Sequence, residues 1–145
     1  MKWLGLGLIW LAGLLASGNA TEPGLRISPK KVRDEVKAVV GAQLAALRKG
    51  DFEAAYGFAA EGIRRQFDAR VFGAMLKHGY EPLTRHRKAD LGIVRDDGEG
   101  TAQVDVTVTD SMNRSTVYRY WLVQQGQDWR ISGVVLEQKP PHGDI

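Results

Sequence analysis

Hydrophobic positions in the first half of the chain recur with the period of an α-helix. Between residues 29 and 49, apolar side chains follow one another at steps of three and four, which places them on one stripe of a helix. Ser28 and Pro29 predict its start, because serine can cap a first-turn N–H and proline suits the first helical position. Lys49 and Gly50 predict its end, since glycine readily turns left-handed there. The stripe consists of Val32, Val36, Val39, Val40, Leu44 and Leu47.

Two shorter helices are predicted to follow, each beginning at an aspartate. Asp51 and Asp68 are suited to accept bonds from first-turn N–H groups, so we expect helices over 52–60 and 69–78. The segment 63–67 between them is predicted to form a turn. The apolar face of the last helix is expected to contain Val71, Phe72, Met75 and Leu76.

From residue 88 onward the period of the pattern changes from 3.6 to 2. Apolar residues, mostly valines, alternate with polar residues over 102–109, as expected of a strand with one solvated face. Segments rich in Gly, Asp and Asn separate the strands and predict turns, and Gly133 marks a possible bulge. The predicted strands are 88–93, 102–109, 116–125 and 129–137, with turns at 96–100, 110–114 and 125–128.

Helices followed by an antiparallel meander predict an α+β fold. We expect the N-terminal helices to pack on one face of a curved, four-stranded antiparallel sheet, with a conical cavity between them. The predicted organisation is a signal peptide over 1–20, a flexible leader over 21–28, a single domain over 29–138 and a flexible tail over 139–145.

The first twenty residues have the pattern of a secretory signal peptide. Lys2 precedes an apolar run from Trp3 to Ala16, and the small residues of Ser17–Ala20 predict cleavage after Ala20. The alternative is a membrane anchor, but the apolar run is shorter than the roughly 20 residues that a bilayer-spanning helix needs. We therefore expect export to the periplasm or secretion from a bacterium, with no membrane span after cleavage.

Composition and charge exclude several function classes. The chain contains no cysteine, which rules out disulfides, thiolate metal sites and cysteine nucleophiles. Loss of Lys2 with the signal peptide leaves 19 basic residues against 17 acidic ones, a net charge of +2. A nearly neutral domain gives no case for nucleic-acid binding.

The residues that could carry chemistry are few. Asp90 and Asp105 fall on the polar side of their strands and are expected at the surface. His78 is expected at a helix end, and His86 in a solvated basic run. Histidines at metal-ligand spacing, a nucleophile elbow and a phosphate loop are all missing. We therefore expect no catalytic residue, no metal and no cofactor.

Several segments carry a resemblance to a known fold family. The order of helices and strands, with a long helix, a glycine–aspartate pair and an alanine-rich helix over 44–56, resembles the nuclear transport factor 2-like superfamily, or cystatin-like cone. The segments 63–67, 79–80 and 129–133 resemble a bacterial family within it, the domain of unknown function DUF4864. The resemblance implies a cone-shaped α+β domain. It fixes no activity, because the superfamily includes isomerases, dehydratases, hydrolases and binding modules.

Aromatic side chains and one basic segment suggest where a ligand could bind. Residues 64–88 carry an excess of basic side chains, which favours an anionic ligand or surface unless acids of the first helix neutralise them. On the strand 116–125, either the tyrosines or Arg119 and Trp121 face the helices, and the pattern leaves this open. The candidate ligand-binding residues are Tyr56, Phe72, Met75, Tyr80, Arg119 and Trp121.

We favour non-catalytic binding of a small apolar or anionic ligand, or of a protein partner, in the cone. One alternative is an enzyme of isomerase, dehydratase or hydrolase type that uses a cavity acid or histidine. A second is a homodimeric accessory module that pairs through an open face of its sheet.

Overall fold

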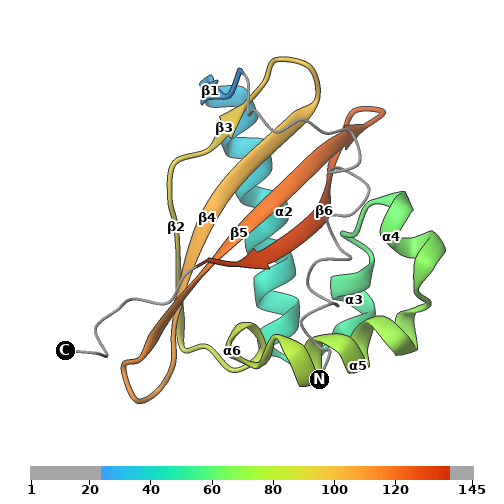
Figure 1. The fold of residues 1–145 in the computed structure, drawn as a ribbon, viewed down its shortest axis with the longest axis vertical. Helices are drawn as coiled ribbons and strands as arrows, with labels where there is room; N and C mark the ends of the chain where they lie inside the picture. Colours follow the sequence, from blue (N-terminus) through green and yellow to red (C-terminus); the bar gives the residue numbers. More distant parts are fainter. Residues whose placement is uncertain (1–23, 138–145) are drawn as a thin grey trace.

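A computed structural model describes residues 24–137, so the predicted signal peptide and the tail over 139–145 lie outside the described residues. Five helices precede most of the sheet, and they cover one of its faces and one of its ends (Figure 1). The helices are α2 (Lys30–Arg48), α3 (Phe52–Tyr56), α4 (Glu61–Gln66), α5 (Ala69–Gly79) and α6 (Glu81–Thr84). The strands are β1 (Arg26–Ile27), β2 (Lys88–Leu91), β3 (Arg95–Asp96), β4 (Thr101–Thr109), β5 (Ser115–Gln125) and β6 (Asp128–Leu136).

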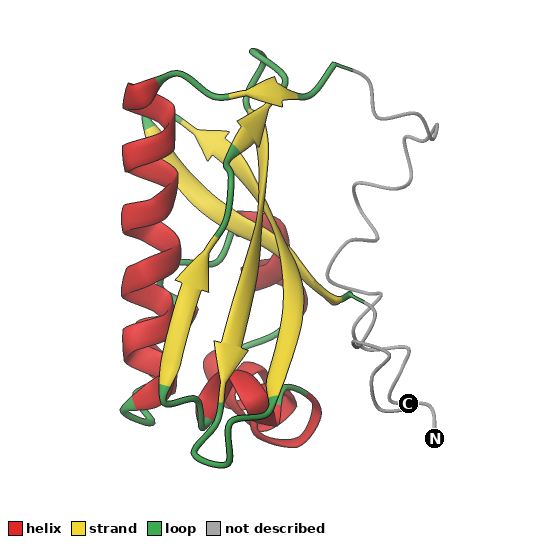
Figure 2. Cartoon of the chain, turned by 90° about the vertical axis from the view of Figure 1, so that its left-hand side faces the viewer, coloured by secondary structure: helices red, strands yellow, loops and turns green. Residues whose placement is uncertain are grey.

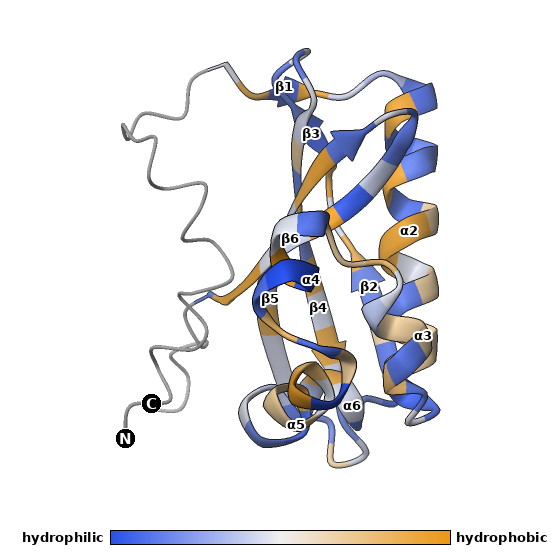
Figure 3. Cartoon of the chain, turned by 90° about the vertical axis from the view of Figure 1, so that its right-hand side faces the viewer, coloured by the Kyte–Doolittle hydropathy of each residue, from blue (hydrophilic) through white to orange (hydrophobic). Residues whose placement is uncertain are grey.

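The long helix α2 runs along one face of the sheet (Figure 2). Its predicted apolar stripe is confirmed, since Val36, Val40 and Leu47 are almost fully buried. Hydrophobic and hydrophilic residues follow each other around its axis (Figure 3), as expected of a helix with one buried side. Within residues 24–137, no helix is both long and apolar enough to cross a membrane.

The prediction that Ser28 caps α2 is wrong. Pro29 occupies the cap position without a side-chain bond, and the Ser28 hydroxyl donates to a carboxylate oxygen of Asp96. The reason is the neighbouring strand pairing: β1 pairs with β3, and the Ser28 N–H donates to the Val94 carbonyl at 3.0 Å. The end of the predicted leader is therefore an ordered part of the sheet.

The shorter helices begin where their aspartates predict. Asp51 accepts the Ala54 N–H at 3.0 Å, and Asp68 accepts the Val71 N–H at 2.9 Å. The first of these helices, α3, ends at Tyr56, earlier than predicted. The chain leaves the helix to pair with β6, where it makes two backbone bonds of 2.8 Å with Ile131.

Two other expectations about the helices are corrected. The segment predicted as a turn over 63–67 belongs mostly to α4, whose first-turn Glu61 lies 3.6 Å from Arg65 one turn later. On α5, Val71 is 39% exposed, because it lies beside the buried stripe formed by Phe72, Met75 and Leu76 and not within it.

The sheet is antiparallel, with the order β1-β3-β4-β5-β6 and β2 paired to β4. It has six strands where four were predicted, because two-residue strands at β1 and β3 extend it. β2 ends at Leu91, before Ile93. The chain between β2 and β3 contains one residue more than the stretch of β4 opposite it, and Ile93 is left 54% exposed.

The predicted bulge is present in β6. Trp121 and its neighbour Leu122 pair with Gly133 and Ile131, so Ser132 is the additional residue. Its hydroxyl oxygen is buried without a hydrogen-bond partner, and it is the one such side-chain atom within residues 24–137. The bulge increases the local twist and curvature of the sheet at this point.

Candidate functional site

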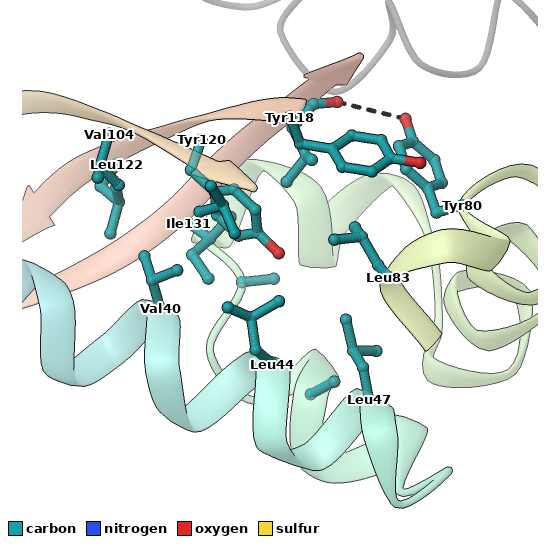
Figure 4. Close-up of a cluster of buried hydrophobic side chains, with 14 of the residues drawn as sticks. Val40, Leu44, Leu47, Tyr80, Leu83, Val104, Tyr118, Tyr120, Leu122 and Ile131 are labelled. Carbon is teal, nitrogen blue, oxygen red and sulfur yellow. Dashed lines mark hydrogen bonds between the residues drawn. The ribbon is translucent and has the colours of Figure 1, made fainter. Parts of the chain in front are cut away.

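The orientation of β5 decides which side chains face the helices. Tyr118, Tyr120 and Leu122 are buried on the helix side, so Arg119 and Trp121 lie on the opposite face, called the outer face here. The valines of β4 also point toward the helices, in the predicted alternation. The tyrosines thus belong to the core beside α2 (Figure 4).

The centre of this core contains one polar pair. The Tyr120 hydroxyl donates to the side-chain oxygen of Gln43 at 2.8 Å, and the two residues are 0% and 1% exposed. Gln43 was not among the predicted core residues. Its place beside Leu44, within the spacing of the apolar stripe, was the signal that could have indicated it.

The candidate residues Tyr56 and Phe72 form part of the packing among the helices. Their ring centroids lie 5.2 Å apart, and Phe72 is completely buried. The Tyr56 hydroxyl donates to the Phe67 carbonyl at 2.6 Å, and the Arg64 guanidinium lies 5.0 Å from the centroid of the Tyr56 ring. The polar group of Tyr56 is therefore used within the fold. Met75 is similarly buried.

Tyr80 and Tyr118 meet where α5 and α6 approach the sheet. Their ring centroids are 6.0 Å apart, and the Tyr80 hydroxyl donates to the Val134 carbonyl at 3.4 Å (Figure 4). Burial raises the pKa of Tyr118 to about 12 and raises the pKa of Tyr80 further. Both phenols are therefore neutral hydrogen-bond donors at neutral pH. Tyr118 was not among the predicted ligand-binding residues.

Arg119 lies at the centre of an ion-pair cluster on the outer face. Its Nε donates to Asp105 at 2.8 Å and its Nη2 donates to the second carboxylate oxygen at 3.2 Å. Glu137 lies 3.6 Å from the same Nε. Asp105 is thus at the surface, as predicted, and Arg119 needs no buried anion. The six candidate residues do not form one site, because Arg119 and Trp121 lie on the face opposite the other four.

The prediction that His86 is solvated is wrong. The residue is 5% exposed, and its Nδ1 lies 2.9 Å from the Leu83 carbonyl. Burial lowers the pKa of His86, and the positive charge of Arg48 lowers it further, against a raising effect of the bond to Leu83. A neutral His86 donates through Nδ1 to that carbonyl. His78 is exposed at the end of α5, in agreement with the prediction.

The basic segment 64–88 finds its partners locally and not on α2. Arg65 lies near Glu61, Arg85 donates to Glu81 at 3.0 Å, and Lys88 lies 3.7 Å from Asp90. Lys77 and Arg64 lie over aromatic rings. Much of the basic excess is therefore engaged with acids and aromatic rings of the neighbouring helices and of β2.

The acidic turn 96–100 supports the chain and shows no sign of a metal site. The carboxylates of Asp96 and Asp97 accept backbone N–H groups of residues 98, 99 and 101 at 2.7–3.0 Å. Asp96, buried and bonded to Ser28, was not predicted as a core residue. In the part of the chain that the structure describes, no cluster of three potential metal ligands occurs.

Comparison with protein families identifies the chain. The model of a domain of unknown function, DUF4864, matches residues 29–143. The chain belongs to the DUF4864 family. None of the curated proteins matches it.

Solved structures with the same fold are distant in sequence. Aln2 from a Streptomyces species is 15% identical over 78% of this chain and 94% of its own, with a TM-score of 0.57. An NTF-2 like protein of unknown function from Shewanella oneidensis MR-1 is 12% identical over 72% and 98%, at 0.53. A putative NTF2-like transpeptidase from Campylobacter jejuni is 11% identical over 72% and 97%, at 0.51. These likenesses show that this DUF4864 protein has the nuclear transport factor 2-like fold.

Proposed function

We propose that this DUF4864 protein is an exported, non-catalytic binding module whose outer sheet face recognises a protein partner. Export rests on Lys2, the apolar run to Ala16 and the small residues that end at Ala20. The observation that carries the binding function is the location of Asp105, a strand acid that is paired with Arg119 on the outer face and not presented inside the cone.

The remaining interior polar groups favour binding over catalysis. Within residues 24–137, the buried polar or charged side chains are Ser28, Gln43, His86 and Asp96. Each of these four is bonded to a protein group: Ser28 to Asp96, Gln43 to Tyr120, and His86 to a backbone carbonyl. The buried Ser132 hydroxyl has no partner, but a neutral hydroxyl is not a general base. A general base must be able to reach a substrate proton. The enzymatic alternative would need one of these bonds to break.

The outer face has the composition of an interface. Half-buried apolar side chains on β5 and β6, namely Val117, Trp121, Val123 and Val135, surround the charged Arg119. The cation of Arg119 and the carboxylates of Asp105 and Glu137 lie side by side. A two-fold axis that passes between Arg119 and these acids would place each guanidinium opposite acids of the other copy, which favours a second copy of this chain as partner.

The oligomeric state tests this proposal. Light scattering coupled to size-exclusion chromatography is expected to give a dimer for the mature protein and a monomer for Trp121→Glu. Val71→Glu is the matched control, because Val71 is an exposed apolar residue on α5, away from the outer face. A dimer that survives Trp121→Glu, or a monomeric parent protein, would refute the proposed surface. Circular dichroism of each variant verifies that it remains folded.

A further inference from the structure

The Tyr118 side chain is buried, yet its hydroxyl group has no hydrogen-bond partner among the residues that the structure describes. Tyr118 is 3% exposed, and no hydrogen bond of its hydroxyl occurs within residues 24–137. Within that range, Ser132 is the one residue with a side-chain oxygen that is both fully buried and without a partner. The Tyr118 hydroxyl oxygen is therefore in contact with solvent. The ring is thus held by the core, while the hydroxyl reaches the surface as a donor that has no partner in the described part of the chain. By contrast, Tyr120 bonds to Gln43.

A second phenol lies beside it. The rings of Tyr80 and Tyr118 are tilted by 39° with centroids 6.0 Å apart, and the Tyr118 hydroxyl points toward the Tyr80 side chain (Figure 4). The Tyr80 hydroxyl donates to Val134 at 3.4 Å, a long distance for an O–H···O bond, which is usually about 2.7–2.8 Å.

An apolar surface adjoins these hydroxyls. Leu136 lies directly opposite Tyr118 in the β5–β6 register, so the two side chains are on the same face of the sheet. Leu136 is 52% exposed, whereas Val106, on the other side of Tyr118 in the β4–β5 register, is completely buried. At this point the sheet extends past the helices that cover its face. Apolar area and hydrogen-bond donors in one place are the usual composition of a small-molecule site.

We infer that Tyr80, Tyr118 and Leu136, named here the rim site, bind an uncharged small molecule with an apolar body and an acceptor oxygen. The oxygen receives the free Tyr118 proton, and the apolar body covers Leu136. This site lies on the helix side of the sheet, so it is independent of the partner surface proposed above.

The surroundings select against a negative charge on the ligand. Tyr80 is both the C-cap residue of α5 and the N-cap residue of α6, so the two helix dipoles oppose each other there, and the acidic side chain of Glu81 follows it. The carbonyl oxygen of Val134, which accepts the Tyr80 hydroxyl, also lies here. A carboxylate bound here would lose its hydration and lie close to negatively charged or partly negative oxygens, which is costly. A neutral ketone or amide oxygen carries no full charge, so its burial costs much less. The raised pKa values of both phenols keep them protonated as donors across the neutral range.

A matched pair of probes tests the rim site. We would titrate the mature protein with 2-naphthamide and with 2-naphthoate, which has the same ring system but carries a charge, and follow the backbone amide signals by NMR. We expect 2-naphthamide to bind at about 1 mM, as befits a fragment of this size. The largest shifts should occur around Tyr118 and residues 134–136, and 2-naphthoate should bind more weakly.

Variants separate the hydrogen bond from the general apolar contact. Tyr118→Phe is expected to weaken 2-naphthamide about fivefold to tenfold, the effect of one hydrogen bond, without loss of stability. Tyr56→Phe is the control, since it deletes the same atom at a hydroxyl bonded to Phe67, and its affinity should equal that of the parent. The inference is overturned if Tyr118→Phe binds as tightly as the parent, if 2-naphthoate binds as well as the amide, or if no signal near the rim site moves.

Discussion

The hydrogen bond between Tyr120 and Gln43 gives the sharpest test of how the core is built. Tyr120→Phe removes a hydroxyl that donates at 2.8 Å to Gln43, in surroundings where the two residues are 0% and 1% exposed. The Gln43 oxygen would then stay buried without a donor, which costs about 1–3 kcal/mol. For a domain of this size, a loss of about 2 kcal/mol lowers Tm by roughly 5–10 °C. Urea unfolding followed by tryptophan fluorescence measures the change directly.

Tyr118→Phe is the matched control for this experiment. It removes the same atom from the same strand, but that hydroxyl has no bond within residues 24–137, so stability should change by less than about 0.5 kcal/mol. The double variant Gln43→Leu with Tyr120→Phe removes both polar partners and should recover part of the loss. Equal destabilisation by Tyr120→Phe and Tyr118→Phe would refute the reasoning, because the loss would then not depend on the buried bond.

Four further predictions concern pH, the N-terminal contact and the outer face. Because the pKa of His86 is lower in the folded protein, the unfolded chain takes up this proton at a higher pH. Stability should therefore fall as pH drops below about 6.5. His86→Asn should make the urea midpoint less dependent on pH over that range. The raised pKa of Tyr118, about 12, has the opposite sign: stability should be complete below about pH 10 and decline as pH rises toward 12, less so in Tyr118→Phe. Ser28→Ala should cost about 1.5–3 kcal/mol, because the bond to the Asp96 carboxylate is lost, whereas Arg26→Ala, at a half-exposed side chain, should cost less than about 1 kcal/mol in the same denaturation assay. Asp105→Asn should cost less than about 1 kcal/mol, and the difference should shrink in 1 M salt if the partly exposed pair with Arg119 acts as a screened surface interaction.

The elements were predictable where local chemistry decides them. The stripe that includes Val36 and Val40 produces α2, and Asp51 and Asp68 begin the helices for which they are suited. Alternation over residues 101–109 produces β4 with one buried face. In each case the signal and the contact lie within a few residues of each other.

The errors arise where a distant residue competes with a local preference. Ser28 has the side chain of a helix cap, but Asp96, 68 residues away, takes its hydroxyl. His86 lies within the basic run 85–88, which suggests solvent, yet it is buried with its Nδ1 2.9 Å from the carbonyl of Leu83 in α6. The alternation of β5 does not decide which of its faces meets α2. In the structure the tyrosine face meets α2, where Tyr120 donates to Gln43.

The candidate site was predictable only in part, for the same reason. Tyr80 was identified from its aromatic ring, but its neighbour Tyr118 becomes relevant only through the register that places Leu136 opposite it. Arg119 and Trp121 were grouped with the helix-side aromatics, although one residue of offset along a strand moves a side chain to the other face. Strand register therefore determines the site, and register depends on the complete sheet.

Native mass spectrometry of the mature protein, purified gently from its natural compartment, tests the central proposal most directly. The account predicts the mass of a chain that begins after Ala20, present as a dimer, and a monomer for Trp121→Glu purified in the same way. A parent protein that is monomeric at the concentration of its compartment would contradict the proposed recognition surface, and a chain that retains residues 1–20 would contradict the predicted cleavage.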